Sequence, residues 1–144
     1  MPRTKKEDSV IAEETVVEEP KLATSFEYSS IGNVNYDFDK GDNVFELRAQ
    51  TPFRMTQGDV RIVTAGLKIR IPEGFVGFVV NGDINPKTQV CVLGSPILIT
   101  PELKEKELLI TLKMFGYGYK IYNMGDVMAK LIILPSKTFK IEKK

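Results

Sequence analysis

The sequence predicts an all-β domain of the sandwich or barrel type, preceded by an extended N-terminal arm. Three observations lead to this prediction. From about Phe26 onward, apolar and polar residues alternate at period two, as they do in strands. Turns that contain glycine or proline interrupt the alternation roughly every 8–12 residues, a spacing typical of sandwiches and barrels. No window of the sequence shows a sustained apolar stripe at helical spacing.

The N-terminal segment, residues 1–24, differs from the rest in composition. Its first 20 residues hold six acidic and three basic residues and no aromatic residue. Its apolar content falls mainly in two pairs, Val10-Ile11 and Val16-Val17. Such a segment cannot bury enough surface to order itself, so we expect an acidic arm that is extended or disordered. The two pairs are candidate partner-binding residues, because each can add as a strand to a neighbouring subunit.

The β domain is expected to cover residues 25–144. Pro72-Glu73-Gly74 is expected to form a turn, because proline presets φ and glycine accepts a positive φ. Asp59, which follows Gln57-Gly58, is expected to lie in a turn that leads into the strand at 60–64. The patterns at 75–80 and 90–93 are apolar on both faces and predict strands that are covered on both sides. The only candidate for a helical turn is 100–106, which starts with Thr-Pro. The predicted strands, in chain order, are 60–64, 67–71, 75–80, 90–93, 108–114, 115–121 and 127–134.

Two local patterns suggest binding but have simpler interpretations. Residues 115–119 read Phe-Gly-Tyr-Gly-Tyr and resemble a platform for stacking bases. Because their alternation also fits a strand, a core or interface role is favoured, and the glycines would let another backbone approach closely. Asn35, Asp37 and Asp39 have the spacing of a calcium loop, but the glutamate that should end such a loop is misplaced. A polar loop is therefore expected there.

Composition excludes several classes of function. The chain has 144 residues, enough for one domain, and a formal net charge of +1, which favours neither nucleic acid nor an acidic membrane surface as a partner. No stretch approaches the roughly 20 apolar residues that span a bilayer. The charged N-terminus is followed by no apolar h-region, so no secretory signal is expected and synthesis in the cytoplasm is the default.

The near absence of metal-ligating and nucleophilic side chains narrows the chemistry further. The sequence contains no histidine and a single cysteine, Cys91. It therefore has no His general base, no Ser–His or Cys–His pair, and too few ligands for zinc. Cys91 lies in an apolar run and is expected to be a small buried thiol. We expect neither a metal site nor a cofactor.

Three segments, in order, carry a resemblance to a known family. Residues 43–49 read Asn-Val-Phe-Glu-Leu-Arg-Ala, residues 71–77 read Ile-Pro-Glu-Gly-Phe-Val-Gly, and residues 125–133 begin Gly-Asp-Val-Met-Ala-Lys-Leu-Ile. Together they resemble motifs of the deoxyuridine triphosphatase (dUTPase) family over about two thirds of the chain. The resemblance implies a dUTPase-like β-barrel or jelly-roll-type sandwich. It also implies a homotrimer, since family members generally share their active sites between three subunits.

The positions that the family uses for catalysis carry other residues. Where the family has an Arg-Ser-Gly phosphate clamp, this chain has Asn81-Gly82-Asp83, and Asp83 would repel a triphosphate. The water-activating aspartate of the family falls on Ile99, Thr100 or Pro101, none of which is a base. The resemblance therefore implies no catalytic residue here.

Further departures point the same way. Glu102 lies close to the position of the family's aspartate but is shifted from it along the sequence. It is the one candidate for a general base in this segment. Lys130 replaces the glutamine of the family, and Glu46 replaces its aspartate. Residues 136–144 contain no glycine, so they cannot form the glycine-rich arm that closes over the nucleotide in the family.

The leading hypothesis is therefore a non-enzymatic structural protein. Degenerate dUTPase-like domains resemble certain head-decoration proteins of tailed bacteriophages, so we expect an auxiliary capsid protein that is synthesised in the host cytoplasm and resides in the virion. Its N-terminal arm would contact the major capsid protein or other virion proteins, with no nucleic acid and no membrane as partners. One alternative is a catalytically dead dUTPase homologue that senses nucleotides or binds a regulatory partner. Another is an active dUTP diphosphatase with shifted catalytic residues.

Overall fold

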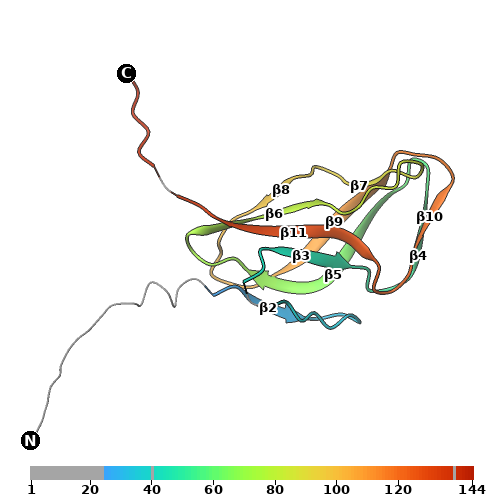
Figure 1. Cartoon of the computed structure of the whole chain (residues 1–144), viewed down its shortest axis with the longest axis horizontal. Coiled ribbons are helices and arrows are strands. Elements are labelled where there is room, and N and C mark those ends of the chain that lie inside the picture. The colour runs from blue at the N-terminus through green and yellow to red at the C-terminus, as the bar shows by residue number, and fades with distance from the viewer. Residues whose placement is uncertain (1–24, 40, 138) are drawn as a thin grey trace, which may run out of the picture.

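The structure is a computed structural model that describes residues 25–39, 41–137 and 139–144. These residues form an all-β domain without helices, which confirms the predicted fold class (Figure 1). The N-terminal arm, with Val10, Ile11, Val16 and Val17, lies outside the described residues. The strands are β2 (Glu27–Ser30), β3 (Val44–Arg48), β4 (Phe53–Thr56), β5 (Val60–Arg70), β6 (Phe75–Asn81), β7 (Val90–Val92), β8 (Ile97–Ile99), β9 (Lys106–Met114), β10 (Tyr119–Tyr122) and β11 (Val127–Pro135).

Two four-stranded antiparallel sheets enclose the core. One has the strand order β3-β11-β6-β8 and is called the β11 sheet below; the other has the order β2-β5-β9-β7 and is called the β9 sheet. β4 and β10 form a separate two-stranded sheet, which lies at the end of the domain opposite to the C-terminal residues of the chain (Figure 1). The buried side chains come from the inward positions of both large sheets, as period two dictates. Fully buried examples are Leu47, Val79 and Leu131 on the β11 sheet and Leu67, Ile110 and Leu112 on the β9 sheet.

β5 contains an irregularity that positions the loop before β3. Thr64 pairs with Leu109 and Lys68 pairs with Glu107, so the three residues 65–67 oppose a single residue of β9. The carbonyl oxygen of Ala65 therefore needs a partner outside the ladder. It accepts hydrogen bonds from the Gln50 Nε2 (2.7 Å) and from the Tyr36 hydroxyl (2.6 Å).

The same two side chains hold residues 33–36 against the body of the domain. The Gln50 Oε1 accepts a hydrogen bond from the backbone N–H of Val34 at 3.0 Å, and the Tyr36 hydroxyl accepts one from the backbone N–H of Arg48 at 2.9 Å. Gln50 is 6% exposed and Tyr36 is 7% exposed. Burial raises the pKa of the Tyr36 hydroxyl above its ordinary value. The loop that the sequence predicts as merely polar is thus fixed by two buried polar side chains.

Both predicted turns are present. Gly74 has a φ of +88°, and the N–H of Phe75 donates to the carbonyl of Pro72. Asp59 closes the turn before β5, because its Oδ2 accepts hydrogen bonds from the N–H of Thr56 at 2.7 Å and from its hydroxyl at 3.0 Å. These bonds lower the pKa of the Asp59 carboxyl.

The predicted strand at 115–121 is wrong in its first half. β10 begins only at Tyr119, because the N–H groups of residues 115–117 donate to the carbonyls of Gln89, Thr88 and Lys87 instead of to a strand. A Cβ on Gly116 would overlap the backbone of Lys87 and Thr88. This confirms the expectation that a glycine here admits a second backbone.

Other local predictions also differ from the structure. The helical turn at 100–106 is wrong: β9 already begins at Lys106, and Leu103 is 93% exposed, so one turn would bury too little to offset its nucleation. The short strands β2, β4 and β8 had no clear sequence pattern of their own and depend on their paired neighbours. The prediction that Cys91 is a buried thiol is wrong. Cys91 is half-buried, because it points to the outer side of the β9 sheet beside Lys113.

We predict that Gly66→Ala destabilises the domain by at least about 2 kcal/mol, because it adds a clash to backbone strain. Gly66 has a φ of +69°, and a Cβ there would overlap the Gln50 carboxamide. Gly74→Ala is the matched control, since Gly74 has a φ of +88° but no atom within 4 Å of a Cβ. The control should lose only about 1 kcal/mol. Equal losses for the two variants in urea unfolding would contradict the proposed role of Gln50.

Candidate functional site

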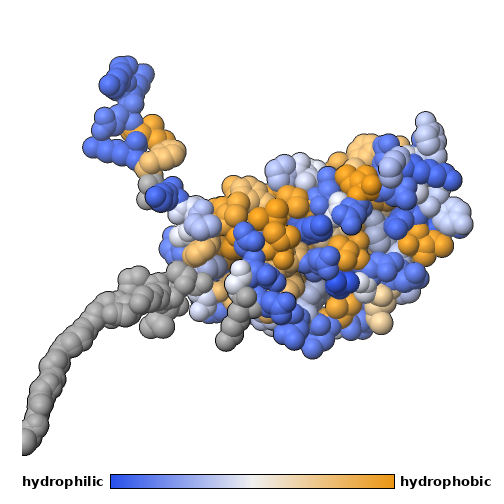
Figure 2. Space-filling model, in the orientation of Figure 1, coloured by the Kyte–Doolittle hydropathy of each residue, from blue (hydrophilic) through white to orange (hydrophobic). Residues whose placement is uncertain are grey.

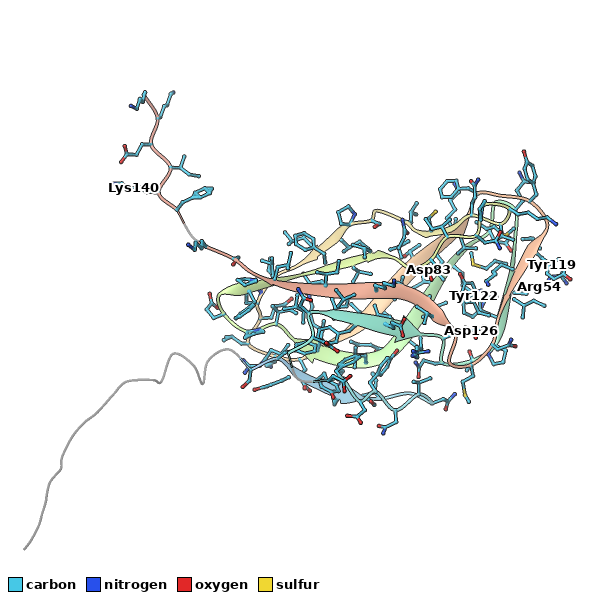
Figure 3. All side chains as sticks on the ribbon, in the orientation of Figure 1. Arg54, Asp83, Tyr119, Tyr122, Asp126 and Lys140 are labelled. Atoms are coloured by element: carbon cyan, nitrogen blue, oxygen red, sulfur yellow. The ribbon has the colours of Figure 1, made fainter. Side chains whose placement is uncertain are left out.

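Three positions that the sequence resemblance connects with chemistry meet at one pocket. Glu46 of β3, Lys130 of β11 and Asp83, two residues beyond β6, line a cavity of about 310 Å³ together with Tyr122 and Asp126. β11 brings them together, because Lys130 pairs with Glu46 on one side and with Val80 on the other. Figure 3 shows Asp83, Tyr122 and Asp126 toward the end of the domain that carries β4 and β10.

The charges of this pocket are largely matched among themselves. Lys130 Nζ lies 3.7 Å from the Asp83 carboxylate, and Glu46 forms an ion pair with Arg48. Arg48 also donates to the carbonyl of Gly125 at 2.8 Å. The lining contains three carboxylates, from Glu46, Asp83 and Asp126, against two ammonium groups. Such a lining disfavours a polyphosphate, which needs unmatched cations or several free N–H donors.

The segment at the phosphate-clamp position joins strands. The Asn81 Oδ1 accepts a hydrogen bond of 2.6 Å from the backbone N–H of Val92, which ties the end of β6 to β7. A Cβ on Gly82 would meet the Ala129 backbone at 3.5 Å. Asn81 and Gly82 therefore contribute to the packing of β6, β7 and β11. Asp83 is the only charged residue of this tripeptide.

The positions that the resemblance connects with a general base, and the candidate carboxylate Glu102, lie elsewhere in the single chain. Ile99 ends β8, and Thr100 and Glu102 line a second pocket of about 360 Å³ next to Arg70. The Glu102 carboxylate lies 2.9 Å from Lys106 Nζ, and this pocket shares no residue with the one around Lys130. Only a site assembled from two copies of the chain would bring these groups together.

Tyr122 is the most strongly perturbed group in the pocket. Its ring is 6% exposed and stacks on Phe53 with 4.8 Å between the ring centroids. Burial, with a smaller contribution from the nearby Asp126 carboxylate, raises the pKa of Tyr122 to about 12. The hydroxyl is therefore a neutral group at ordinary pH. Its neighbour Lys120 places its Nζ 5.1 Å from the ring centroid of Tyr122.

A second candidate site is the outer face of the β11 sheet, which is apolar where a solvated face would be polar. One row of paired residues crosses all four strands: Val44, Ile132, Phe78 and Leu98. Leu98 is 56% exposed and Val44 is 47% exposed, and Phe78 and Ile132 are half-buried. Val76 and Leu134 extend the row as a neighbouring pair. Figure 2 shows apolar surface over β6, β8 and β11.

The outer face of the β11 sheet and the end of β7 in the other sheet correct one prediction from the sequence. The patterns at 75–80 and 90–93 predict strands that are covered on both sides, but the described residues of one chain cover only their inner sides. Phe78 is half-buried, and Leu93 is 44% exposed beyond the end of β7. The sequence thus reveals the apolar pattern, but the residues that the structure describes leave its outer side uncovered. A partner surface would explain the composition of the outer face.

Comparisons with known proteins bear on the fold. No protein-family model matches the sequence, and no curated protein matches it. Solved structures do match. A mutant dUTPase from phage phi11 of S. aureus superposes with a TM-score of 0.65 and 16% identity, covering 83% of this chain and 96% of that chain. The dUTPase of Staphylococcus bacteriophage 80alpha gives a TM-score of 0.65 and 14% identity over the same shares of the two chains.

The fold is dUTPase-like. At this level of identity the likeness establishes the fold alone, which confirms the structural part of the resemblance seen in the sequence. A structure of the 80alpha enzyme with the nucleotide analogue dUpNHpp gives the same TM-score and covers 88% of that chain. In addition, the described residues contain no helix that is long and apolar enough to cross a membrane.

We predict that Tyr122 makes stability depend on alkaline pH. Its folded pKa lies above the ordinary value of 10.0, so its contribution is complete below pH 10 and is lost as the pH rises toward 12. Between about pH 9 and about pH 11, the free energy of unfolding should fall by about 1 kcal/mol more in the wild type than in Tyr122→Phe. Urea unfolding at both pH values measures this difference. Parallel pH curves for the two proteins would contradict the assignment.

Proposed function

We propose that this chain is a non-enzymatic structural protein built on a self-associating dUTPase-like scaffold. One observation carries the proposal: the pocket that contains Asp83, at the phosphate-clamp position of the resemblance, matches its own charges, with Lys130 beside Asp83 and Glu46 beside Arg48. A triphosphate would have to displace Asp83 from Lys130 and would find no arginine at the clamp position. We infer from this arrangement that selection maintains the scaffold and does not maintain hydrolysis.

The apolar outer face of the β11 sheet supports self-association. A row of four apolar side chains across the whole sheet is larger than the scattered apolar residues of an ordinary monomer surface. The resemblance to the dUTPase family implies a homotrimer, so we assign this face to contacts between three copies. Burial of Phe78 and Leu98 between copies would cover the outer side of their strands, which the described residues of one chain leave exposed.

Within this class, we propose an auxiliary or decoration protein of a tailed-bacteriophage capsid. A rigid trimer suits the local three-fold positions of a capsid shell. The acidic N-terminal arm supplies the means of attachment, with Val10-Ile11 and Val16-Val17 as strand-like contacts to the major capsid protein. The protein would then reside in the virion.

A regulatory role is the second candidate. The dUTPase of Staphylococcus bacteriophage 80alpha is described as controlling the transfer of virulence genes by a proto-oncogenic G protein-like mechanism. A related use of the scaffold would require that this chain bind a nucleotide or a regulatory protein. The ion pairs of Lys130 with Asp83 and of Glu46 with Arg48 favour the structural role over nucleotide sensing.

Incubation with dUTP and Mg²⁺ tests whether the pocket is inactive. We expect no pyrophosphate above background and no saturable binding of dUpNHpp, because Asp83 and the missing arginine disfavour the phosphates. Turnover of roughly 1 per second or faster would establish an enzyme instead. Tight analogue binding without turnover would favour the nucleotide sensor.

The same protein should co-sediment with assembled capsids of its phage. A variant with serine at Val10, Ile11, Val16 and Val17 should lose co-sedimentation while its β domain unfolds at the same urea concentration as the wild type. Retention of capsid binding by this variant would show that the arm is not the attachment.

Leu98→Glu tests the self-association face. It places a charge in the middle of the proposed contact and should convert the oligomer to a monomer, because a buried unpaired carboxylate is strongly unfavourable. Leu103→Glu is the matched control, since Leu103 is 93% exposed and lies outside the outer face of the β11 sheet. Sedimentation equilibrium measures the mass of each protein. An oligomer that survives in Leu98→Glu would place the contact on another surface.

A further inference from the structure

Three aromatic side chains are exposed in and around the turn at 115–118. Phe115 is 49% exposed, Tyr117 is 70% exposed and Tyr119 is 56% exposed. The sequence pattern favours a core or interface role for this segment, but these exposures contradict the core role. Large rings in contact with water are typical of surfaces that bind a partner. The segment is therefore a candidate binding surface.

Two of these rings have a cation in contact with them. The Arg54 guanidinium lies 4.6 Å from the ring centroid of Tyr119, and the Lys113 Nζ lies 5.1 Å from that of Phe115. Both distances are within the range of a cation–π contact. Strand pairing positions the first pair, because β4 and β10 are neighbours, and Figure 3 shows Arg54 and Tyr119 together at one end of the domain. Each pair presents a flat apolar surface next to a positive charge.

A loop at 85–89 holds the middle of the segment in place. The Asn85 Oδ1 accepts a hydrogen bond from the N–H of Lys87, and the Asn85 carbonyl accepts one from the N–H of Gln89, both at 2.8 Å. Gln89 has a φ of +48°, which is uncommon for a residue with a Cβ and costs free energy. The last three carbonyls of this loop accept the N–H groups of residues 115–117. The segment is thus fixed before a partner binds, which lowers the cost of binding.

Lys87 adds a third cation to this surface. Its Cε would lie 3.8 Å from a Cβ on Gly118, so its side chain lies against the turn. Among the residues that the structure describes, Arg54, Lys87 and Lys113 form no ion pair with a carboxylate. Asp59, the carboxylate in the turn between β4 and β5, already closes that turn. The three cations and three rings are called the aromatic patch below: Arg54, Lys87, Lys113, Phe115, Tyr117 and Tyr119.

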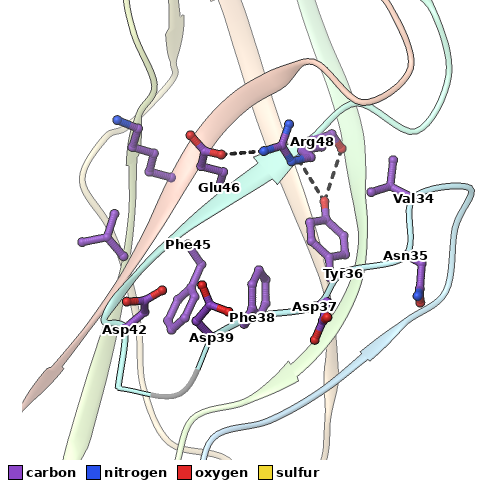
Figure 4. Close-up of a pocket in the computed structure, with 12 residues that line it drawn as sticks. Val34, Asn35, Tyr36, Asp37, Phe38, Asp39, Asp42, Phe45, Glu46 and Arg48 are labelled. Atoms are coloured by element: carbon purple, nitrogen blue, oxygen red, sulfur yellow. Dashed lines mark hydrogen bonds and ion pairs between the residues drawn. The ribbon is translucent and has the colours of Figure 1, made fainter.

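The charges of the domain are separated on its surface. Four carboxylates line a groove of about 510 Å³ beside β3, and they belong to Asp37, Asp39, Asp42 and Glu46 (Figure 4). This groove shares no residue with the aromatic patch. The net charge of +1, from which the sequence predicts no nucleic-acid partner, averages over these two regions. A local excess of positive charge attracts a polyanion even where the total charge of the chain is small.

We propose that the aromatic patch binds single-stranded nucleic acid. Bases stack on the three rings, and the three cations approach the adjacent phosphates. Stacking tolerates every base, so little sequence preference is expected. No residue of the patch belongs to the pocket around Lys130 or to the apolar row of the β11 sheet. The site is therefore additional to the proposed function and does not depend on it.

The exposed rings select a single strand over other polyanions. A double strand hides the faces of its bases, so it would contact the cations and leave the rings idle. The N-terminal arm has six carboxylates and no basic residue over residues 7–20. It matches the charge of the patch, but it contains no aromatic group that could stack on the rings. Only a single strand uses both components of the patch.

Fluorescence anisotropy with a labelled oligothymidine tests the proposal. The oligomer has about 20 nucleotides, since sites of this kind cover roughly 4–16 nucleotides. The full-length protein should bind it saturably at low salt, and more tightly than a duplex of the same length. Tyr117→Ala and Tyr119→Ala should each raise the dissociation constant about tenfold, because each removes a stacking surface. Tyr119→Phe should bind like the wild type, since the ring remains.

Phe139→Ala is the matched control. Phe139 is 77% exposed and is followed by Lys140, but it lies outside the aromatic patch. This variant should bind the oligothymidine as tightly as the wild type. Urea unfolding of each variant checks that the domain keeps its stability, which is expected because the substituted rings are exposed.

Salt dependence separates the cations from the rings. Arg54→Gln and Lys87→Gln should each lower the slope of the logarithm of the dissociation constant against the logarithm of salt concentration by about 0.7, because each loses one phosphate contact. Tyr117→Ala should leave the slope unchanged, since it removes no charge. A residue that only supports the fold would not produce this split.

Several results would overturn the proposal. One is the absence of saturable oligothymidine binding, and another is an equal loss of affinity in Phe139→Ala and Tyr119→Ala. Equal affinity for the duplex, with no effect of either tyrosine substitution, would show that the patch binds by charge alone. Competition by polyglutamate at equal affinity would assign the patch to an acidic protein segment instead.

Discussion

The described domain depends on how the irregularity in β5 is satisfied. Three residues of β5 oppose one residue of β9, and the carbonyl of Ala65 that is left out of the ladder is bonded by Gln50 and Tyr36. Both side chains are buried, so these bonds are strong and costly to remove. They also hold the loop at 33–39 beside β3. The core, the loop and the end of β3 thus share one polar network.

The pocket around Lys130 belongs to the dUTPase-like scaffold, and its charged side chains pair with one another. Strand pairing alone brings Glu46, Asp83 and Lys130 together, because β11 lies between β3 and β6. What the scaffold then does depends on the side chains at these positions. Here two carboxylates and two cations neutralise one another, and Asn81 serves to connect β6 with β7. A fold of this type is compatible with different functions, since the strand pairing does not depend on which side chains line the pocket.

The outer surfaces of the domain contain more unpaired structure than a monomer usually tolerates. The β11 sheet exposes an apolar row, and its edge strand β3 has a partner on one side only among the described strands. Each of these features is unfavourable in an isolated chain and favourable at a contact with a partner.

The sequence by itself determined the fold class, most of the long strands and the turns at Gly58 and Gly74, because these depend on local periodicity and on residue type. Only the tertiary structure decided that 115–118 is a turn held by Lys87–Gln89, that β2, β4 and β8 are strands, and that Lys130 faces Asp83. Such features depend on partners distant in the chain. The apolar residues of β6 were visible in the sequence, but the open outer side of the strand appeared only when the sheets were packed.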